Sequence, residues 1–246
     1  MSQQADRTPE AGRIVVLSYN ICHGEGADGR IDLERTAAVI RAAAPDVAML
    51  QEVDRCTERS RGVDQARALA GLAGLHASYG ASMPFQGGAY GNAILSRSPP
   101  AAAPRCVPLP GDEPRCALIV SLETAAGRFR AAATHLDLNP ARQLEAAARL
   151  VPLAREDPDR PMLLAGDMNA PPGGPVLNSL ERAWTRISGA GLLPTFPASA
   201  PADAIDHILC RPAGRWKAVD IRVLDAAAAS DHRPLLAVLE LLPPGP

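Results

Sequence analysis

Polar side chains end several apolar segments of this 246-residue chain, at positions where a buried strand would not place them. They are carboxylates, amides and imidazoles, and they occur in Ser18-Tyr19-Asn20, Gln51-Glu52, Thr134-His135, Gly166-Asp167-Met168-Asn169, Ile205-Asp206-His207 and Ser230-Asp231-His232. Any one of them alone has an ordinary alternative as a turn residue, a surface charge or a satisfied core histidine. Burying all of them would be costly unless they met one another or an ion. We therefore expect them to gather in one polar site.

Oxygen donors predominate in these segments, and hard cations prefer oxygen ligands. The five cysteines form no CxxC pair, so neither a zinc knuckle nor a disulfide framework is indicated. The pattern favours Mg²⁺, or Mn²⁺, over Zn²⁺. An imidazole oriented by a carboxylate could take a proton from an attacking water, and a second imidazole with the amides could hold charge on phosphoryl oxygens. The chemistry indicated is hydrolysis of a phosphoester.

Short apolar runs alternate with amphipathic segments along the chain. Strands are predicted at 14–18, 47–53, 76–83, 93–96, 117–123, 129–135, 162–165, 205–210, 219–224 and 235–241. Helices are predicted at 33–44, 63–73 and 141–154. This order favours an α/β or α+β architecture with two sheets over a repeated βαβ barrel. The Pro- and Gly-rich stretches 98–114, 171–175 and 189–201 are predicted to be surface loops.

Composition and charge narrow the class of protein. Apolar residues make up 47% of the chain and charged residues 21%, which is typical of a folded domain. The formal net charge of −2 provides no basic excess for a nucleic-acid backbone. Residues 1–12 are predicted to be a disordered tail without the features of a signal peptide, and residues 13–246 a single domain. With no apolar run near the roughly 18 residues of a membrane span, a cytoplasmic protein is expected.

Taken in order, the polar segments resemble the motifs of the endonuclease/exonuclease/phosphatase superfamily. The chain looks most like the small bacterial metal-dependent hydrolases of that superfamily. These DNase I-like phosphoesterases include nucleases, neutral sphingomyelinases and inositol polyphosphate 5-phosphatases. The resemblance also takes in Gly91-Asn92-Ala93-Ile94-Leu95-Ser96-Arg97 and extends over residues 14–240. It implies a four-layer α/β sandwich, in which two mixed β-sheets face each other and helices cover the outside.

The same resemblance implies a role for each site residue. The metal ligands would be Glu52, Asp231 and Asn20, holding Mg²⁺ or Mn²⁺. The catalytic residues would be His232 as general base, Asp206 orienting it, Asp167 and Asn169 holding nucleophile and phosphate, and His135 stabilising phosphoryl oxygens. Mechanisms in the family differ on whether the aspartate or the histidine deprotonates water. The ordinary pKa of imidazole favours His232.

Four further residues are weighed for the site. Strand alternation turns His207 to the face opposite Asp206, so it is left out. His23 could reach a substrate, but a loop histidine is the more common reading. Arg142 and Arg233 are candidate substrate-binding residues, with surface decoration as the alternative.

The function predicted is a divalent-metal-dependent phosphoesterase that hydrolyses a phosphodiester by in-line attack of water. With a single lysine, 3% aromatic residues and a slight negative charge, the chain favours a small molecule or lipid headgroup over duplex DNA. A Mg²⁺-dependent endo- or exonuclease is the alternative. A non-catalytic binding module is disfavoured, because every expected group is present. The sequence identifies no protein partner.

Overall fold

Two six-stranded sheets form the centre of the molecule in the computed structural model, which describes residues 12–189 and 191–244. Of the predicted tail, all but Gly12 lies outside these ranges. The first sheet has the order β11 (Trp216–Val223), β12 (Leu235–Leu241), β1 (Arg13–Asn20), β2 (Val47–Arg55), β4 (Gly88–Ser96), β3 (His76–Phe85). The second has the order β5 (Arg105–Leu109), β6 (Arg115–Thr124), β7 (Gly127–His135), β8 (Met162–Asp167), β10 (Asp206–Arg211), β9 (Thr185–Arg186).

Polar caps set the ends of the main helices. Asp32 and Asp64 accept hydrogen bonds from the first turns of α1 (Leu33–Ala43) and α2 (Gln65–Ala73), and Asn139 does the same for α3 (Pro140–Leu153). The remaining helices are α4 (Pro175–Leu180) and the short 3₁₀ turns η1 (Cys22–Gly24) and η2 (Ala213–Arg215). Within the described ranges, no helix combines the length and apolarity needed to cross a membrane.

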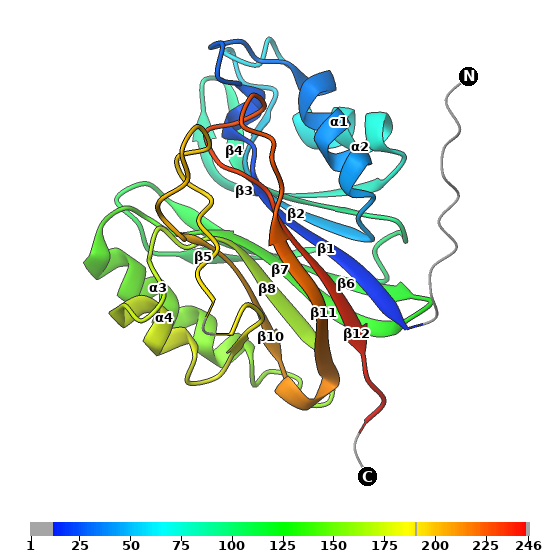
Figure 1. Cartoon of the computed structure of the whole chain (residues 1–246). Helices are drawn as coiled ribbons and strands as arrows, with labels where there is room; N and C mark the ends of the chain where they lie inside the picture. The colour runs from blue at the N-terminus through cyan, green and yellow to red at the C-terminus, as the bar shows by residue number, and fades with distance from the viewer. Residues whose placement is uncertain (1–11, 190, 245–246) are drawn as a thin grey trace.

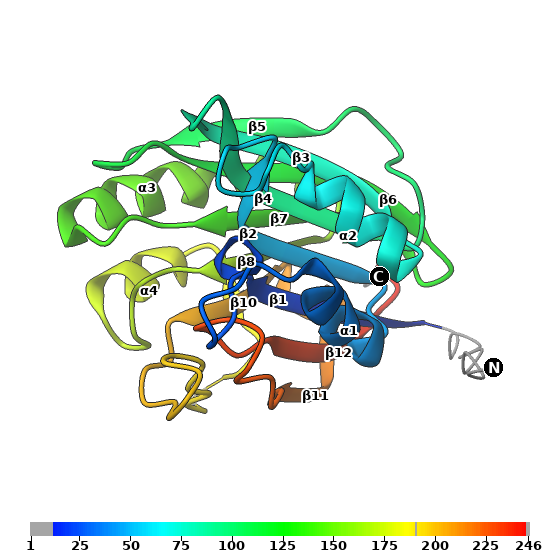
Figure 2. The same cartoon turned by 90° about the horizontal axis from the view of Figure 1, so that it is seen from above.

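Three apolar layers hold the sheets and helices together. Side chains such as Met49 and Leu163 pack between the two sheets, Leu50 packs toward α1 and α2, and Leu164 packs toward α3 and α4. Strand alternation supplies both faces, so each sheet is buried on its two sides. Figures 1 and 2 show α1 and α2 on the outside of one sheet, with α3 and α4 on the outside of the other. The predicted four-layer sandwich is confirmed.

Four elements depart from the sequence expectation. Residues 98–114 are not wholly a loop, because β5 pairs there with β6 at the sheet edge, where Pro108 is tolerated. Helix α4 begins at Pro175, the last residue of the predicted loop 171–175, and neither α4 nor β9 was predicted. Helix α2 begins at Gln65 rather than at residue 63, because Asp64 caps it.

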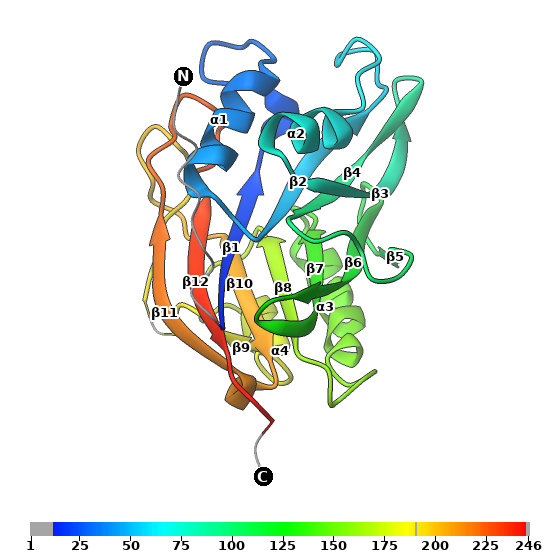
Figure 3. The same ribbon diagram turned by 90° about the vertical axis from the view of Figure 1, so that its right-hand side faces the viewer.

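The two parallel strand pairs, β1–β2 and β7–β8, have their carboxyl ends at the same edge of the sandwich. β1–α1–β2 and β7–α3–β8 are crossover units with parallel strands, and all other pairings are antiparallel. Asn20 ends β1, while His135 and Asp206 lie opposite Asp167 in the strands that flank β8. Figure 3 shows the loop after β1 and the loop before β12 at the upper end of the molecule. Polar groups from four strands therefore meet at one edge.

Gly166→Ala should destabilise the fold, because Gly166 has a φ of 153° and a Cβ there would overlap the carbonyl oxygen of Thr134. We expect urea denaturation to show a loss of roughly 2–4 kcal/mol in the free energy of unfolding. Gly71→Ala in α2, where a Cβ meets nothing within 4 Å, should instead add about 0.5–1 kcal/mol. Equal midpoints for the two variants would contradict the packing described here.

Candidate active site

Glu52 occupies a bulge in β2, near the edge where the parallel strands end. The register with β4 shifts between Leu50 and Val53, so β2 holds one extra residue there. Glu52 takes a left-handed conformation (φ 59°), which costs a non-glycine residue about 1–3 kcal/mol. A bulge re-aims its side chains, and the carboxylate of Glu52 meets the side chain of Asn20.

Asn20 connects the two sheets through its buried amide. Its Nδ2 donates to Oε1 of Glu52 (3.1 Å) in the first sheet and to Oδ2 of Asp167 (3.2 Å) in the second. Its Oδ1 accepts from the backbone N–H of Cys22 (3.0 Å). The amide is 1% exposed and engages partners through both of its polar atoms. Carboxylates from two separate sheets are thus held on one amide.

His232 lies between two carboxylates. Its Nδ1 is 2.8 Å from Oδ2 of Asp206, and its Nε2 is 3.5 Å from Oδ2 of Asp167. Thr195 donates to the same oxygen of Asp206 (2.5 Å), and the ring of Phe196 packs 4.9 Å from the imidazole. These contacts fix the ring, with Nδ1 toward Asp206 and Nε2 toward Asp167.

The charges of this group shift its pKa values. Burial alone would lower the pKa of His232, but the hydrogen bond and charge of Asp206, followed by the charge of Asp167, raise it to about 9. Burial, followed by the charge of Asp206, raises the pKa of Asp167 to about 7. The ordinary titration range of imidazole is therefore not a sufficient reason to prefer His232 as the base. The charges of Asp167 and His232 act on each other, so the protonation of one changes the pKa of the other.

Asn169 also has a left-handed backbone (φ 48°) beside the network. Its N–H donates to Oδ1 of Asp167 (2.9 Å), and its side-chain Nδ2 donates to the carbonyl of Leu136 (3.0 Å). The same Nδ2 is 3.2 Å from Nε2 of His135, and Gln143 donates to the carbonyl of Asn169 (3.0 Å). Neighbours on three sides therefore keep the amide next to His135.

His135 remains neutral at neutral pH. Burial, followed by the positive charges of Arg115 and His232, holds its pKa well below the ordinary value. Its Nε2 is 3.6 Å from Oδ2 of Asp167, so the ring belongs to the same network. A neutral imidazole can donate one hydrogen bond without adding charge.

Ser230 fastens the loop before β12 to the end of β1. Its hydroxyl donates to the carbonyl of Asn20 (2.7 Å), lies 3.2 Å from Oδ1 of Asp231, and accepts from the N–H of His232 (3.2 Å). Asp231 is exposed and His232 is buried, so the two adjacent side chains face different surroundings. The loop delivers both to one edge of the network.

Carboxylates without a cationic partner fit a divalent ion at this edge. Within the described ranges, neither Glu52 nor Asp231 forms an ion pair with Arg or Lys. Burial, followed by the charges of Asp231, Glu52 and Glu25, raises the pKa of the Cys22 thiol. Three negative groups thus act on one position, and carboxylate oxygens suit hard cations. The metal-binding role of Glu52, Asp231 and Asn20 stays a prediction; Nδ2 of Asn20 lies 3.1 Å from Oε1 of Glu52, and the charges of Glu52 and Asp231 both act on Cys22.

Arg142 and Arg233 do not join this network. Arg142 lies on the exposed side of α3, where Asp112 (3.1 Å) and Glu145 (3.0 Å) bind its guanidinium. Arg233 is 3.2 Å from Asp225 on its own loop. In the part of the chain that the structure describes, the charges of both arginines are paired with these carboxylates. The structure therefore gives no support to the predicted substrate-binding role of either residue.

The sequence comparison agrees with this geometry. The model of the endonuclease/exonuclease/phosphatase family matches residues 17–232. The chain belongs to this family. Its members are hydrolases that act on phosphoester bonds, and the family generally uses a divalent metal.

Relatives within the family cover nearly the whole chain. YbhP of Escherichia coli K12 is 28% identical over 245 residues, 92% of this chain and 96% of its own. The structure of a family member from Beutenbergia cavernae is 29% identical with a TM-score of 0.75, covering 93% of this chain and 72% of that one. A mannosyl-6-phosphatase from Bacteroides thetaiotaomicron has a TM-score of 0.73 over 92% of this chain and 99% of its own. At 18% identity, the latter shows the fold alone.

Sequence reasoning missed several supporting residues of this family site. Thr195 lies in the stretch 189–201, predicted to be a surface loop, yet it is fully buried against Asp206. No periodicity marks it. Ser230 stands inside the Ser-Asp-His motif and could have been found there. His207 faces away as predicted, with its Nε2 2.9 Å from the carbonyl of Ala170.

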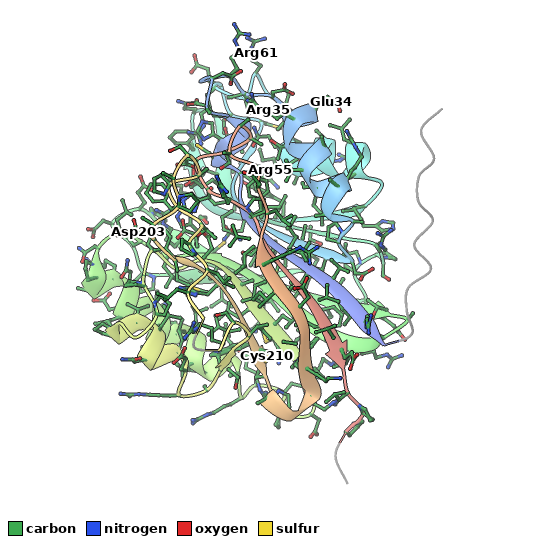
Figure 4. The ribbon with its side chains drawn as sticks, in the orientation of Figure 1. Glu34, Arg35, Arg55, Arg61, Asp203 and Cys210 are labelled. Atoms are coloured by element: carbon green, nitrogen blue, oxygen red, sulfur yellow. The ribbon has the colours of Figure 1, made fainter. Side chains whose placement is uncertain are left out.

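Asp206→Asn should lower the pKa of His232 from about 9 toward or below the ordinary imidazole value, because the amide keeps the shape but loses the charge. An NMR titration of the imidazole protons in metal-free protein measures this. Asp203→Asn changes an exposed aspartate in the segment just before β10 (Figure 4). It serves as the control and should leave the pKa of His232 unchanged. A pKa that stays near 9 in Asp206→Asn would show that another group sets it.

Proposed function

We propose that this chain is a divalent-metal-dependent phosphoesterase that hydrolyses a small phosphodiester by in-line attack of water. The observation that carries the proposal is the continuous network from Glu52 through Asn20 and Asp167 to His232 and Asp206. The network connects Glu52, a carboxylate without a cationic side-chain partner among the described residues, to Asp167 and His232, which can take up a proton. Hydrolysis of a phosphoester needs both.

Glu52 and Asp231 would hold the divalent cation, Mg²⁺ or Mn²⁺, with the amide of Asn20 beside them. Such an ion, when bound, polarises a phosphoryl oxygen and offsets the charge that grows on it. The bulge at Glu52 supports this role, because residues with a strained backbone are found mainly at active sites and ligand-binding positions, where the surrounding structure holds them in place.

His232 and Asp167 would handle the proton of the attacking water. Asp206 fixes the imidazole through Nδ1 and stabilises its charged form, so Nε2 is directed toward Asp167. With the pKa of His232 raised to about 9 and that of Asp167 to about 7, the imidazole carries a proton near neutral pH, and the water's proton would pass to the carboxylate of Asp167 as the oxygen attacks phosphorus. The ester oxygen would leave on the opposite side and take its proton from solvent.

Asn169 and His135 would hold the phosphoryl oxygens. Their side chains lie 3.2 Å apart beside Asp167, and both are uncharged at neutral pH. Donors fixed before the reaction stabilise developing charge without reorganising. The contacts from Leu136 and Gln143 supply that rigidity.

A cavity of about 610 Å³ lies beside this site and favours a small anionic substrate. Two of its lining residues contact His23. Oε2 of Glu25 is 3.4 Å from His23 Nε2, and Gln65 donates to the carbonyl of His23 (2.6 Å). The wall also includes Arg30, Ile31, Arg61 and Val63.

The cavity combines charge with apolar surface. Within the described ranges, the guanidiniums of Arg30 and Arg61 have no carboxylate partner, and Ile31 and Val63 are 37% and 38% exposed. Figure 4 shows Arg61 projecting at the end of the molecule that carries these loops. Such a wall suits a phosphodiester with a second anionic group on a partly apolar body.

His232→Ala should reduce turnover of bis-p-nitrophenyl phosphate roughly 10²–10⁴-fold, because the imidazole that Asp206 holds beside Asp167 is lost from the proton-transfer group. His76→Ala, an exposed histidine at the start of β3, is the matched control. EDTA should abolish the wild-type rate, and Mg²⁺ or Mn²⁺ should restore it. Wild-type turnover in His232→Ala, or activity that survives EDTA, would contradict the proposal.

Parallel assays on phosphomonoesters, phosphatidylinositol derivatives, sphingomyelin and plasmid DNA identify the substrate class. Preferential nicking of DNA would favour the nuclease alternative.

Arg61→Ala should raise the KM for a phosphodiester that carries an additional phosphate by about 1.5- to 5-fold, as expected for an exposed ion pair. The kcat should stay unchanged, because the cavity lies outside the reacting groups. Bis-p-nitrophenyl phosphate lacks a second anionic group, so its KM should not change. Arg128→Ala, which removes an exposed arginine paired with Glu123, is the control. Equal KM changes for both substrates would argue against a role of this cavity.

A further inference from the structure

Three potential metal ligands of different chemistry meet at the start of the loop after β1. The thiol of Cys22, a ring nitrogen of His23 and a carboxylate oxygen of Glu52 lie within 4.8 Å of one another, and all three residues are half-buried. Only Glu52 belongs to the donor set of the proposed hydrolytic site. Cys22 and His23 thus add sulfur and nitrogen to a site made otherwise of oxygen.

An unusual backbone brings the adjacent side chains together. Cys22 and His23 are both left-handed (φ 44° and 45°), at an expected cost of about 1–3 kcal/mol each. Neighbouring groups hold this conformation: the N–H of Cys22 donates to Asn20, and the carbonyl of His23 accepts from Gln65. In an extended strand the two side chains would point to opposite faces. Here they share one position with Glu52.

The cluster has polar groups that remain unsatisfied. Nδ1 of His23 is buried without a hydrogen-bond partner among the described residues. Nε2 of the same ring is 3.4 Å from Oε2 of Glu25, so Nδ1 is the ring nitrogen that is left without a partner. Three carboxylates, Glu52, Glu25 and Asp231, act on the thiol of Cys22. A bound cation would offset this negative charge and give the imidazole a partner.

We propose that Cys22, His23 and Glu52 form a binding site for a borderline divalent ion such as Zn²⁺. One thiolate, one imidazole and one carboxylate are the ligand types that zinc accepts, whereas Mg²⁺ is coordinated by oxygen. Binding would displace the thiol proton of Cys22, so the metal is coordinated by a thiolate. This site shares Glu52 with the proposed function but does not depend on hydrolysis.

Sharing Glu52 couples the two sites. An ion bound by Cys22 and His23 would also use the carboxylate of Glu52, which the hard cation of the hydrolytic site needs. The two ions would therefore share this carboxylate or compete for it. Changing Cys22 should therefore alter which metal the protein prefers. It should leave the groups that take the proton, Asp167 and His232, in place.

Titration of the full chain with Co²⁺, a spectroscopic substitute for Zn²⁺, tests the site directly. A thiolate ligand gives a near-ultraviolet sulfur-to-cobalt charge-transfer band, which we expect in the wild type and in Cys56→Ser. The band should be absent in Cys22→Ser. Calorimetry should show Zn²⁺ binding weakened at least about tenfold in Cys22→Ser and in His23→Gln, while Mg²⁺ binding changes less than twofold.

Two outcomes would overturn this inference: no band in the wild type, or a band that persists in Cys22→Ser. Circular dichroism confirms that each variant is folded. The result is independent of the phosphoesterase proposal, because the band is read without substrate. Loss of the band with full Mg²⁺-supported hydrolysis in Cys22→Ser supports the separate site, whereas a band in a protein that hydrolyses no phosphoester would leave the metal site and remove the proposed function.

Discussion

The buried amide of Asn20 is the contact on which the rest of the site depends. It joins a carboxylate of the first sheet to a carboxylate of the second, residues otherwise separated by the apolar layer between the sheets. A buried polar group left without its partners costs about 1–3 kcal/mol. The relative position of the two sheets at this edge is therefore stabilised by polar contacts as well as by packing, and the distance from Glu52 to Asp167 is fixed before any ligand arrives.

Strain is concentrated around the same amide. Cys22, His23, Glu52 and Asn169 all have left-handed backbones, although none is glycine. Residues of this kind persist only where neighbours hold them. Here Asn20 accepts a hydrogen bond from Cys22, and Gln65 and Gln143 donate hydrogen bonds to His23 and Asn169. The apolar layers supply the stability that offsets this strain. The same backbone conformations direct side chains inward at an edge where simple strand alternation would scatter them.

Features that follow from the order of segments along the chain and from the alternation of side chains along a strand could be predicted from the sequence. Most strands, helices α1 and α3 to within one residue of their ends, and the opposite orientation of His207 could be predicted from local patterns, whereas the Asp64 cap that starts α2 was missed. Glu52 and His232 were found because acidic and imidazole groups at strand ends are unusual. The rest depends on folding in three dimensions: the bulge that turns Glu52, the burial of Thr195 in a loop without periodicity, and the pairing of Arg142 with Asp112. Adjacent residues such as Cys22 and His23 do not fit a ligand-spacing rule, because only their backbone angles place them on one side.

The uneven charge at the edge of the sandwich links the fold to the chemistry. On one side, His232 balances Asp206 and Asp167 within a buried and internally hydrogen-bonded group. On the other, Glu52 and Asp231 form no ion pair with Arg or Lys among the described residues, and the charges of both act on the thiol of Cys22. A cation that bound only the folded chain at these carboxylates would stabilise the fold by mass action. One edge of the sandwich therefore holds two kinds of carboxylate: those balanced within the protein by an imidazole, and those without a cationic side chain.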